Sequence, residues 1–243
     1  EEPIVQELAN EYLTEQGITI LNDVTLNSVS NDGNKPVITS NGQNYTFDAV
    51  LYATGRKPNT ANIGLENTDI TTNERGAIVV NDTCESSVPS VYAVGDVNGG
   101  PQFTYISLDD FRIVFGALTG NGQYTLKDRK NIPYTTFLTP PLARVGLTEG
   151  DAINKGYTVK TKEMLVATMP RAHVNDYLKG AFKIVVNADN DLILGATLYS
   201  QGAEELINLI KMAMDNNIPY TYFKNQIFTH PTMAENLNDL CNF

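Results

Sequence analysis

The chain carries the stretch Ser90-Val91-Tyr92-Ala93-Val94-Gly95-Asp96, in which an apolar run ends at a Gly-Asp pair. Such a run predicts a buried strand, and open α/β sheets bind ligands at the carboxyl ends of their strands. Gly95 has no Cβ, so a ligand can approach the backbone there. The carboxylate of Asp96 accepts hydrogen bonds from polyol hydroxyl groups and repels phosphate. The stretch therefore favours the ribityl chain of a flavin, although a strand followed by a Gly-Asp turn is also an ordinary structural pattern.

The composition is that of a folded protein, because 42% of the 243 residues are hydrophobic and 19% are charged. The formal net charge of −11 disfavours nucleic acid, which binds to basic surfaces. No segment approaches the roughly 18 consecutive apolar residues of a membrane span. The acidic start Glu1-Glu2-Pro3 is unlike a signal peptide. We therefore expect a cytoplasmic protein without membrane attachment.

The first fifty residues predict one helix followed by strands. An amphipathic helix is expected over residues 3–16, where Pro and Gly stand at the two ends. A buried strand is expected at 18–21. A β-meander with turns at 31–33 and 41–42 follows, and it ends in a strand over 49–53.

A second helix is expected shortly after the Gly-Asp pair. Its apolar residues recur at helical spacing and predict one apolar face, and Gly120 and Gly122 predict its end. The residues of this face are Leu108, Phe111, Phe115 and Leu118.

The pattern changes at about residue 131, where separate strands and helices indicate an α+β domain. Thr148 and Asp151 have the spacing of a reciprocal cap at the start of a short helix. A later helix over 204–216 has Leu206, Ile207, Ile210 and Ala213 on its inward side. The expected strands are 134–138, 158–166, 181–187 and 192–199.

The chain has two histidines, and only one of them stands in a suggestive context. His230 precedes Pro231, a residue suited to the first position of a helix, so His230 is expected at the helix N-cap. Glu235 is close enough in sequence to approach the imidazole and to hold one tautomer. His173 lies in a segment without a chemical pattern and is expected in an exposed loop.

Three motifs, in this order, carry a resemblance to a known family. They are residues 50–59 (VLYATGRKPN), residues 90–96 and residues 228–235 (FTHPTMAE). They resemble the flavoprotein disulfide reductases of the glutathione reductase and lipoamide dehydrogenase type, also called class I pyridine nucleotide-disulfide oxidoreductases. The resemblance covers the whole chain but only part of the family.

The resemblance implies both site residues and cofactors. It implies that His230 is the acid–base for a thiol and that Glu235 orients it. It implies FAD and NAD(P)H as cofactors. No metal is expected, because Asp151, Asp189 and Asp191 have neither the spacing nor the His partners of a metal site. The cofactor-binding residues that it implies are Gly95 and Asp96, then Gln102, Phe103, Thr104 and Tyr105 at the start of a helix, and Gly55 beside the nicotinamide.

The resemblance also implies three parts in the chain. Residues 1–52 correspond to the end of an NAD(P)-binding domain, residues 53–130 to the end of an FAD-binding domain, and residues 131–243 to an interface domain. In the family this last domain pairs across a two-fold axis and donates its His to the partner. We therefore expect a homodimer through residues 131–243, with neither nucleic acid nor membrane as a partner.

Several motifs of the family are missing from this sequence. There is no Gly-x-Gly-x-x-Gly motif, and Cys84 and Cys241 belong to no CxxC or CxxxxC pair. Cys241 is expected to be a core residue. The chain is therefore expected to be the C-terminal portion of a longer enzyme and to be inactive by itself.

Three alternatives to a disulfide reductase stay open. The chain can be a folded dimerisation module without activity, which the missing redox motifs favour. It can belong to a flavin- and NAD(P)H-dependent reductase without thiol chemistry. It can also belong to a metal-ion reductase of the mercuric reductase type, but these end in paired cysteines and Cys241 is single.

Overall fold

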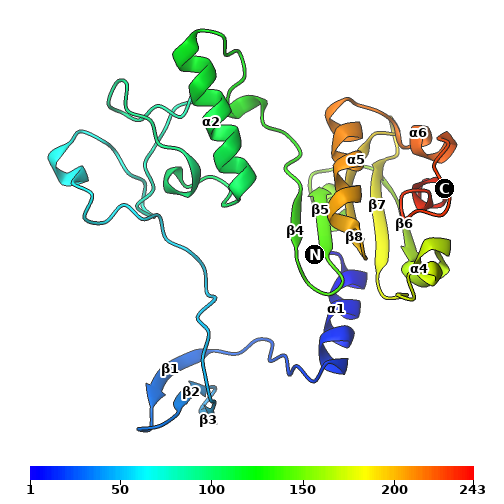
Figure 1. The fold of residues 1–243 in the computed structure, drawn as a ribbon, viewed down its shortest axis with the longest axis horizontal. Coiled ribbons are helices and arrows are strands. Elements are labelled where there is room, and N and C mark those ends of the chain that lie inside the picture. The colour runs from blue at the N-terminus through cyan, green and yellow to red at the C-terminus, as the bar shows by residue number, and fades with distance from the viewer. The chain divides into compact units, whose positions relative to one another are not determined.

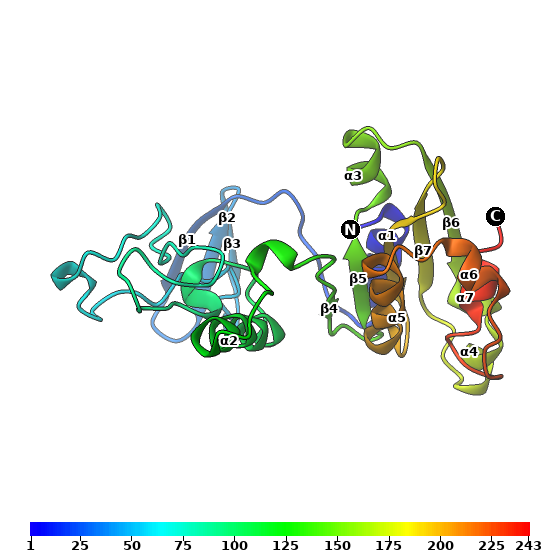
Figure 2. The same cartoon turned by 90° about the horizontal axis from the view of Figure 1, so that it is seen from above.

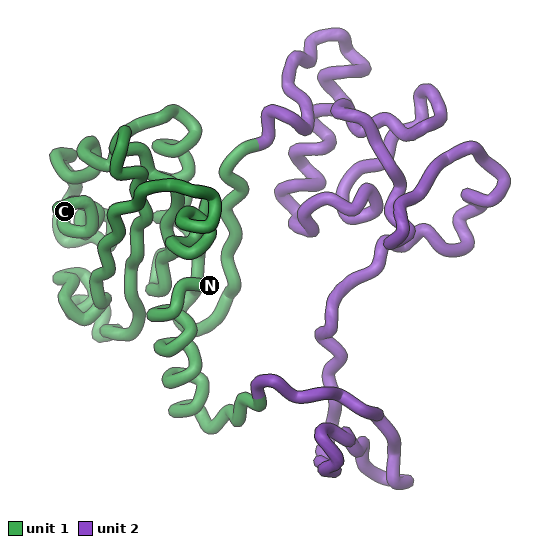
Figure 3. Tube along the Cα trace, turned by 180° about the vertical axis from the view of Figure 1, so that it is seen from behind, with its two compact units in different colours: residues 1–21, 130–243 green, residues 22–129 purple.

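The structure is a computed structural model that describes residues 1–243. The chain divides into two compact units, which Figure 3 colours separately. Unit 1 consists of residues 1–21 and 130–243, and unit 2 consists of residues 22–129. Both units combine helices with antiparallel strands, which confirms the mixed α/β architecture. No helix has the length and apolar character needed to cross a bilayer.

A five-stranded sheet forms the centre of unit 1 (Figure 1). All its neighbouring strands are antiparallel, and their order in space is β4-β5-β8-β7-β6. The three longest strands are those predicted over 158–166, 181–187 and 192–199. The strands are β4 (Tyr134–Thr136), β5 (Leu142–Gly146), β6 (Val159–Leu165), β7 (Ala181–Asn187) and β8 (Ile193–Tyr199).

Helix α5 (Ala203–Asp215) packs on one face of this sheet (Figure 2). Its four predicted inward residues are buried, which confirms the orientation derived from their spacing. They pack with apolar side chains of β5, β7 and β8 in the larger core of the molecule. The same core includes residues of three short helices, α4 (Pro170–Val174), α6 (Tyr220–Asn225) and α7 (Asn236–Leu240).

Helix α1 (Pro3–Glu15) belongs to unit 1 and packs on its sheet. The sequence instead associates this helix with the NAD(P)-binding domain. Val5 and Tyr12 of α1 form a small core with Leu142 of β5 and Tyr199 of β8. The rings of Tyr12 and Tyr199 stack with centroids 5.8 Å apart. The backbone N–H of Gly180 donates to the hydroxyl of Tyr12 at 2.9 Å. With α1 and α5 both packed on the sheet, all seven residues of β7 are buried.

A buried lysine connects the start of α1 to the sheet. Lys183 of β7 is 5% exposed and forms ion pairs with Glu2 at 3.0 Å, Glu149 at 2.7 Å and Glu163 at 2.9 Å. Burial lowers the pKa of Lys183, but hydrogen bonds to the three carboxylates outweigh it and raise the pKa above its ordinary value. The charge of Lys183 is therefore compensated on several sides.

Helix α3 (Glu149–Asn154) has the predicted reciprocal cap. The backbone N–H of Asp151 donates to the hydroxyl of Thr148 at 3.0 Å, and the N–H of Thr148 donates to the carboxylate of Asp151 at 3.3 Å. Hydrogen bonds from the Thr148 side chain, and then from its backbone N–H, to the carboxylate favour the charged form and lower the pKa of Asp151. The cap places Glu149 next to Lys183.

Unit 2 contains a three-stranded antiparallel meander and one long helix. The meander consists of β1 (Leu26–Asn31), β2 (Pro36–Ser40) and β3 (Gln43–Thr46), and the helix is α2 (Thr104–Thr119). The turn between β2 and β3 has positive φ at Asn41 and Gly42, as a two-residue hairpin loop requires. Gly120 ends α2 in a left-handed conformation, as predicted.

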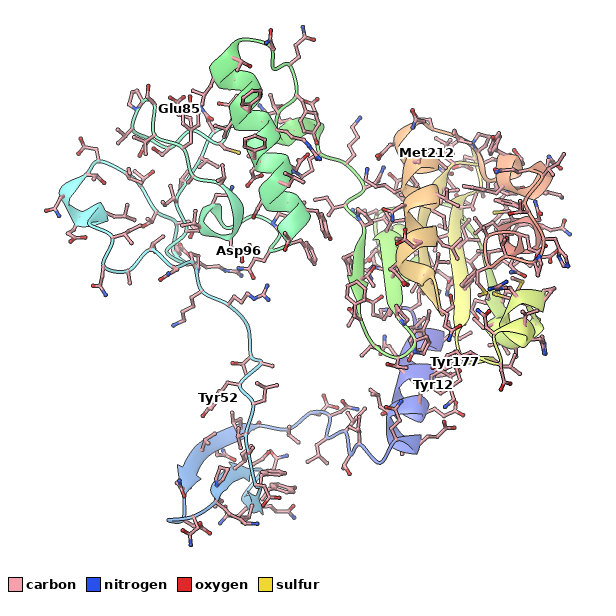
Figure 4. All side chains as sticks on the ribbon, viewed as in Figure 1. Tyr12, Tyr52, Glu85, Asp96, Tyr177 and Met212 are labelled. Atoms are coloured by element: carbon pink, nitrogen blue, oxygen red, sulfur yellow. The ribbon has the colours of Figure 1, made fainter.

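Three predicted strands are absent, and this part of the prediction is wrong. Residues 18–21 and 49–53 are not strands, and Leu51 is 88% exposed. Tyr52 lies on the same extended connection (Figure 4). Within 90–96 there is only an isolated bridge between Tyr92 and Glu85. The physical reason is that a strand needs a neighbour for its backbone hydrogen bonds. Residues 84–86 pair with 91–93 over one bridge only, and no strand pairs with 18–21 or 49–53.

The predicted apolar face of α2 is not the buried face of the helix in this chain. Leu108, Phe111, Phe115 and Leu118 are all exposed. The buried residues of the helix are Ile106, Asp110 and Ile113, which lie on a different side. The sequence of α2 is apolar on several sides, so periodicity alone does not determine which side meets the rest of the unit.

Candidate functional site

The predicted pair of His230 and Glu235 is in contact. Nδ1 of His230 lies 2.8 Å from Oε2 of Glu235. The His230 side chain is 69% exposed, whereas Glu235 is 19% exposed. A carboxylate only accepts hydrogen bonds, so Nδ1 carries the hydrogen in this contact and Nε2 is the nitrogen available to a further partner.

The backbone around this pair differs from the prediction. His230 is not a helix N-cap, because α7 begins only at Asn236. The two side chains meet across an irregular segment instead of along a helix. The spacing predicted the contact correctly, while the predicted local structure was wrong.

Thr232 positions Glu235 and was given no role in the sequence-based prediction. Its backbone N–H donates to Oε1 of Glu235 at 3.1 Å, and its hydroxyl accepts from the N–H of Glu235 at 3.2 Å. Both carboxylate oxygens therefore have partners. The hydrogen bonds to His230 and then to Thr232 lower the pKa of Glu235, which keeps it ionised. The signal in the sequence is Thr-x-x-Glu, the spacing of a capping box.

Two asparagines hold the segment that leads to the pair. The side-chain amide of Asn238 donates to the carbonyls of Phe223 at 2.6 Å and Gln226 at 2.9 Å. The amide of Asn236 donates to the carbonyls of Thr232 at 3.2 Å and Met233 at 3.1 Å. These bonds replace those of regular secondary structure and orient the residues before α7.

Gly95 and Asp96 begin a 3₁₀ turn over Gly95–Asn98. Gly95 has φ +73°, and a Cβ there would lie 2.5 Å from Oγ of Ser107 in α2. The glycine therefore permits the close packing of the turn against the helix, a reason that the sequence did not reveal. Asp96 is exposed, and its carboxylate has no hydrogen-bond or ion-pair partner in the chain (Figure 4).

The other predicted cofactor residues lie in unit 2 as well. Helix α2 begins at Thr104, and its N-cap residue Phe103 has no side-chain oxygen to bind the first N–H groups. The rings of Phe103 and Tyr105 stack with centroids 5.0 Å apart, and Gln102 precedes them. The 3₁₀ turn contacts α2, so Asp96 and the start of α2 belong to one local arrangement. Gly55 has φ +121° and lies on an exposed connection.

The remaining histidine lies in a helix, which corrects the predicted loop. His173 is part of α4, and its Nε2 lies 2.8 Å from the carbonyl oxygen of Ala167. Its side chain is exposed and, unlike that of His230, forms no ion pair with a carboxylate. His173 is therefore a suitable control for His230.

Both cysteines are buried and are expected to be unreactive in the folded protein. Burial raises the pKa of Cys84 to about 11 and that of Cys241 to about 12. Both thiols stay protonated at pH 8, and the thiolate is the reactive form. Titration with Ellman's reagent at pH 8 should detect no thiol in the native chain and both thiols in denaturant. Rapid reaction of the native chain would contradict the assigned burial.

Comparison with known proteins gives consistent matches along the chain. The profile of the pyridine nucleotide-disulphide oxidoreductase family matches residues 1–110, and that of the family's dimerisation domain matches residues 132–241. The probable pyridine nucleotide-disulfide oxidoreductase RclA of Escherichia coli strain K12 is 44% identical over 94% of this chain and 52% of its own length. A mercuric reductase of Staphylococcus aureus is 36% identical over 97% of this chain and 44% of its own length.

The same similarity appears among solved structures. The structure of the HOCl-induced flavoprotein disulfide reductase RclA from Escherichia coli superimposes with a TM-score of 0.95 and 41% identity. It covers 99% of this chain, which corresponds to 55% of the RclA chain. The chain thus spans about half the length of the relatives that it matches.

Proposed function

The chain belongs to the pyridine nucleotide-disulphide oxidoreductase family, and from this premise we propose that the whole protein moves electrons from NAD(P)H through FAD to a disulfide or a related acceptor. His230 serves as the acid–base for a thiol, and Glu235 orients it. The observation that carries the proposal is the 2.8 Å contact between Nδ1 of His230 and Oε2 of Glu235, together with the exposure of the imidazole. This arrangement is suited to proton exchange at Nε2.

The proton chemistry follows from the properties of the two side chains. Nε2 of His230 accepts the proton of a substrate or enzyme thiol, which produces the nucleophilic thiolate. The ionised Glu235 stabilises the positive charge that the imidazole then carries. The same nitrogen returns the proton when a thiolate leaves. Thr232 keeps the carboxylate in place through its backbone N–H.

The residues around Asp96 fit a flavin. The exposed carboxylate of Asp96 has no partner in the chain and is available to the hydroxyl groups of a ribityl chain. The start of α2, with Gln102, Phe103, Thr104 and Tyr105, presents the positive end of a helix. Gly55 borders the nicotinamide in this proposal. When bound, FAD supplies a carrier that takes up two electrons from NAD(P)H and passes them to the acceptor.

The proposal assigns three functional parts to the chain. Residues 1–52 belong to the NAD(P)-binding domain, residues 53–130 to the FAD-binding domain and residues 131–243 to the interface domain. The change of compact unit after residue 129 supports the last division. The packing of α1 on the sheet of unit 1 adds a contact between the first and third parts.

One observation favours a disulfide over a metal ion as the electron acceptor. Cys241 is fully buried and its pKa is raised to about 12, so it offers no thiolate to a metal. The similarity to mercuric reductases keeps metal-ion reduction as the second candidate. A comparison of NAD(P)H oxidation with disulfide substrates and with mercuric ion distinguishes the two.

The flavin assignment is tested by Asp96→Ala in the whole protein. Loss of the charged acceptor should weaken FAD binding by about 10- to 100-fold, as expected for hydrogen bonds to an ionised group. Fluorescence titration of the apo-protein with FAD measures this change. Glu74→Ala is the control, because it removes an exposed carboxylate elsewhere in unit 2. Equal FAD affinity of wild type and Asp96→Ala would refute the assignment.

We also propose that the chain forms a homodimer through residues 131–243. The match to a dimerisation domain supports it. So do exposed apolar residues on α5, such as Met212 (Figure 4), and before His230, such as Ile227. The interface should bury well over about 1,000 Å². Analytical ultracentrifugation at micromolar concentration should give the dimer mass.

Two variants test whether the dimer forms through the proposed surface. Ile227→Asp places a charge in the proposed interface and should shift the protein to monomer. Val174→Asp, at an exposed apolar position on α4, should stay dimeric. Wild type of monomer mass would contradict the proposal. A dimer that binds no FAD would support the alternative of an assembly module without activity.

A further inference from the structure

Asp110 is a buried carboxylate that the proposed chemistry does not use. It lies in the middle of α2 and is 0% exposed. Its Oδ2 accepts from the backbone N–H of Gly95 at 2.7 Å and from the side-chain amide of Asn98 at 2.9 Å. Its Oδ1 accepts from Nη2 of Arg129. A single carboxylate therefore binds both ends of the 3₁₀ turn that carries Asp96.

Asn98 extends this network along the turn. Its side-chain amide also donates to the carbonyl of Ala93 at 3.3 Å, and its side-chain oxygen accepts from the N–H of Gly100 at 3.0 Å. Asn98 is thereby hydrogen-bonded to the backbone on both sides of Asp96, at Ala93 and at Gly100. Asn98 is itself hydrogen-bonded to Asp110. Rotation of the turn requires that these bonds break together.

Arg129 is the counter-charge that permits a buried carboxylate at this position. Its side chain is 11% exposed, and its Nε donates to Asp109 at 2.8 Å. Buried ion pairs often add little net stability compared with apolar residues of similar volume. An ionised Asp110 does, however, provide acceptors in fixed directions, since Arg129 orients it and Gly95 has no side chain between the turn and α2.

We propose that Asp110 is a positioning residue for flavin binding, which sets the orientation of Asp96 through the N–H of Gly95 and the amide of Asn98. This inference rests on the proposed function, in which Asp96 binds the ribityl hydroxyls. Asp110 itself touches no cofactor. Asp110 affects FAD affinity by orienting the 3₁₀ turn that carries Asp96. A residue that only stabilises unit 2 would not act through Asp96.

Asp110→Asn tests the inference in the whole protein. An amide cannot accept from both Gly95 and Arg129, because one of its two ends donates. FAD affinity should fall about tenfold, which corresponds to about 1.4 kcal/mol. The amide of Gly95, followed by hydrogen exchange in the apo-protein, should exchange faster. Glu74→Gln is the matched control, because it makes the same carboxylate-to-amide change on an exposed residue of unit 2 that is not paired with Arg129.

A double-mutant cycle with Asp96→Ala separates positioning from a structural role. If Asp110 acts through Asp96, the double variant binds FAD no more weakly than Asp96→Ala alone. Additive losses would overturn the positioning role while leaving the flavin assignment intact. Undiminished FAD binding by Asp96→Ala would instead refute the flavin assignment, and the inference with it. If Asp110→Asn does not fold, Asn98→Ala takes its place in the same cycle, with a smaller loss and the same criterion.

Discussion

Replacing His230 with Gln is expected to lower the turnover of the whole protein by about a hundredfold or more, because positioned acid–base catalysts contribute factors of this size. Glutamine has a similar length and can still bind Glu235, but it does not exchange a proton near neutral pH. Steady-state oxidation of NAD(P)H with a disulfide substrate measures the effect. The variant should also lose the part of the pH profile of kcat/KM that depends on the imidazole.

Two further variants make this result specific. His173→Gln removes the other histidine, which lies in α4 and has no ion pair with a carboxylate, and should leave turnover unchanged. Glu235→Gln keeps the general shape of the pair but removes the charge, and should lower turnover by about tenfold. Full activity of His230→Gln would favour a flavoprotein reductase without thiol chemistry.

Replacing Lys183 with Met is expected to destabilise unit 1 by about 3–5 kcal/mol, the usual cost of removing one partner from a buried ion pair. The substitution leaves Glu2, which is 2% exposed, without its cation. The adjacent carboxylates of Glu149 and Glu163 then also repel it. Urea unfolding followed by circular dichroism gives the free energy of unfolding.

The control is Lys179→Met, which removes a lysine paired with Glu15 at the surface. This lysine also lies over the ring of Tyr12, so a loss of at most about 1.5 kcal/mol is expected. The double variant Lys183→Met/Glu2→Gln should regain part of the stability, since the unpaired charge is gone. A loss at Lys183 no larger than that at Lys179 would show that the cluster does not stabilise unit 1.

The pH dependence of the Lys183 effect has a definite sign. The pKa of Lys183 is raised in the folded state above its ordinary value of 10.5. Its contribution is therefore complete below about pH 10.5 and is lost as the pH rises through the folded-state pKa. The difference in unfolding free energy between wild type and Lys183→Met should stay constant between about pH 6 and 9.

Most of the α+β part was predictable from the sequence. The strands β6, β7 and β8, the inward residues of α5 and the cap of Thr148 and Asp151 agree with the predicted pattern. These features depend on residues close in sequence, whose periodicity reports both the type of element and its buried face. The contact of His230 with Glu235 also follows from short spacing, although the backbone that permits it was not predicted.

Unit 2 was predicted less well, because its structure depends on contacts between segments that are far apart in the sequence. Its apolar runs at 49–53 and 90–94 resemble strands, but a strand forms only beside another strand. The run at 18–21, which belongs to unit 1, forms no strand for the same reason. The apolar residues of α2 are spread around the helix, and the buried side is the one that carries Asp110. The role of Asp110 was not predictable, because it depends on a contact with Gly95 in another element.

The sequence by itself determined the strands β6, β7 and β8, the buried face of α5, the cap of α3, the turns of the meander, the family resemblance and the approach of His230 to Glu235. Only the tertiary structure decided that α1 packs on the sheet of unit 1, that Glu2 pairs with Lys183, and that Asp110 binds the turn of Asp96. Periodicity specifies which face of an element is apolar, but not which distant element meets it. Buried charges find their partners only when the chain has folded.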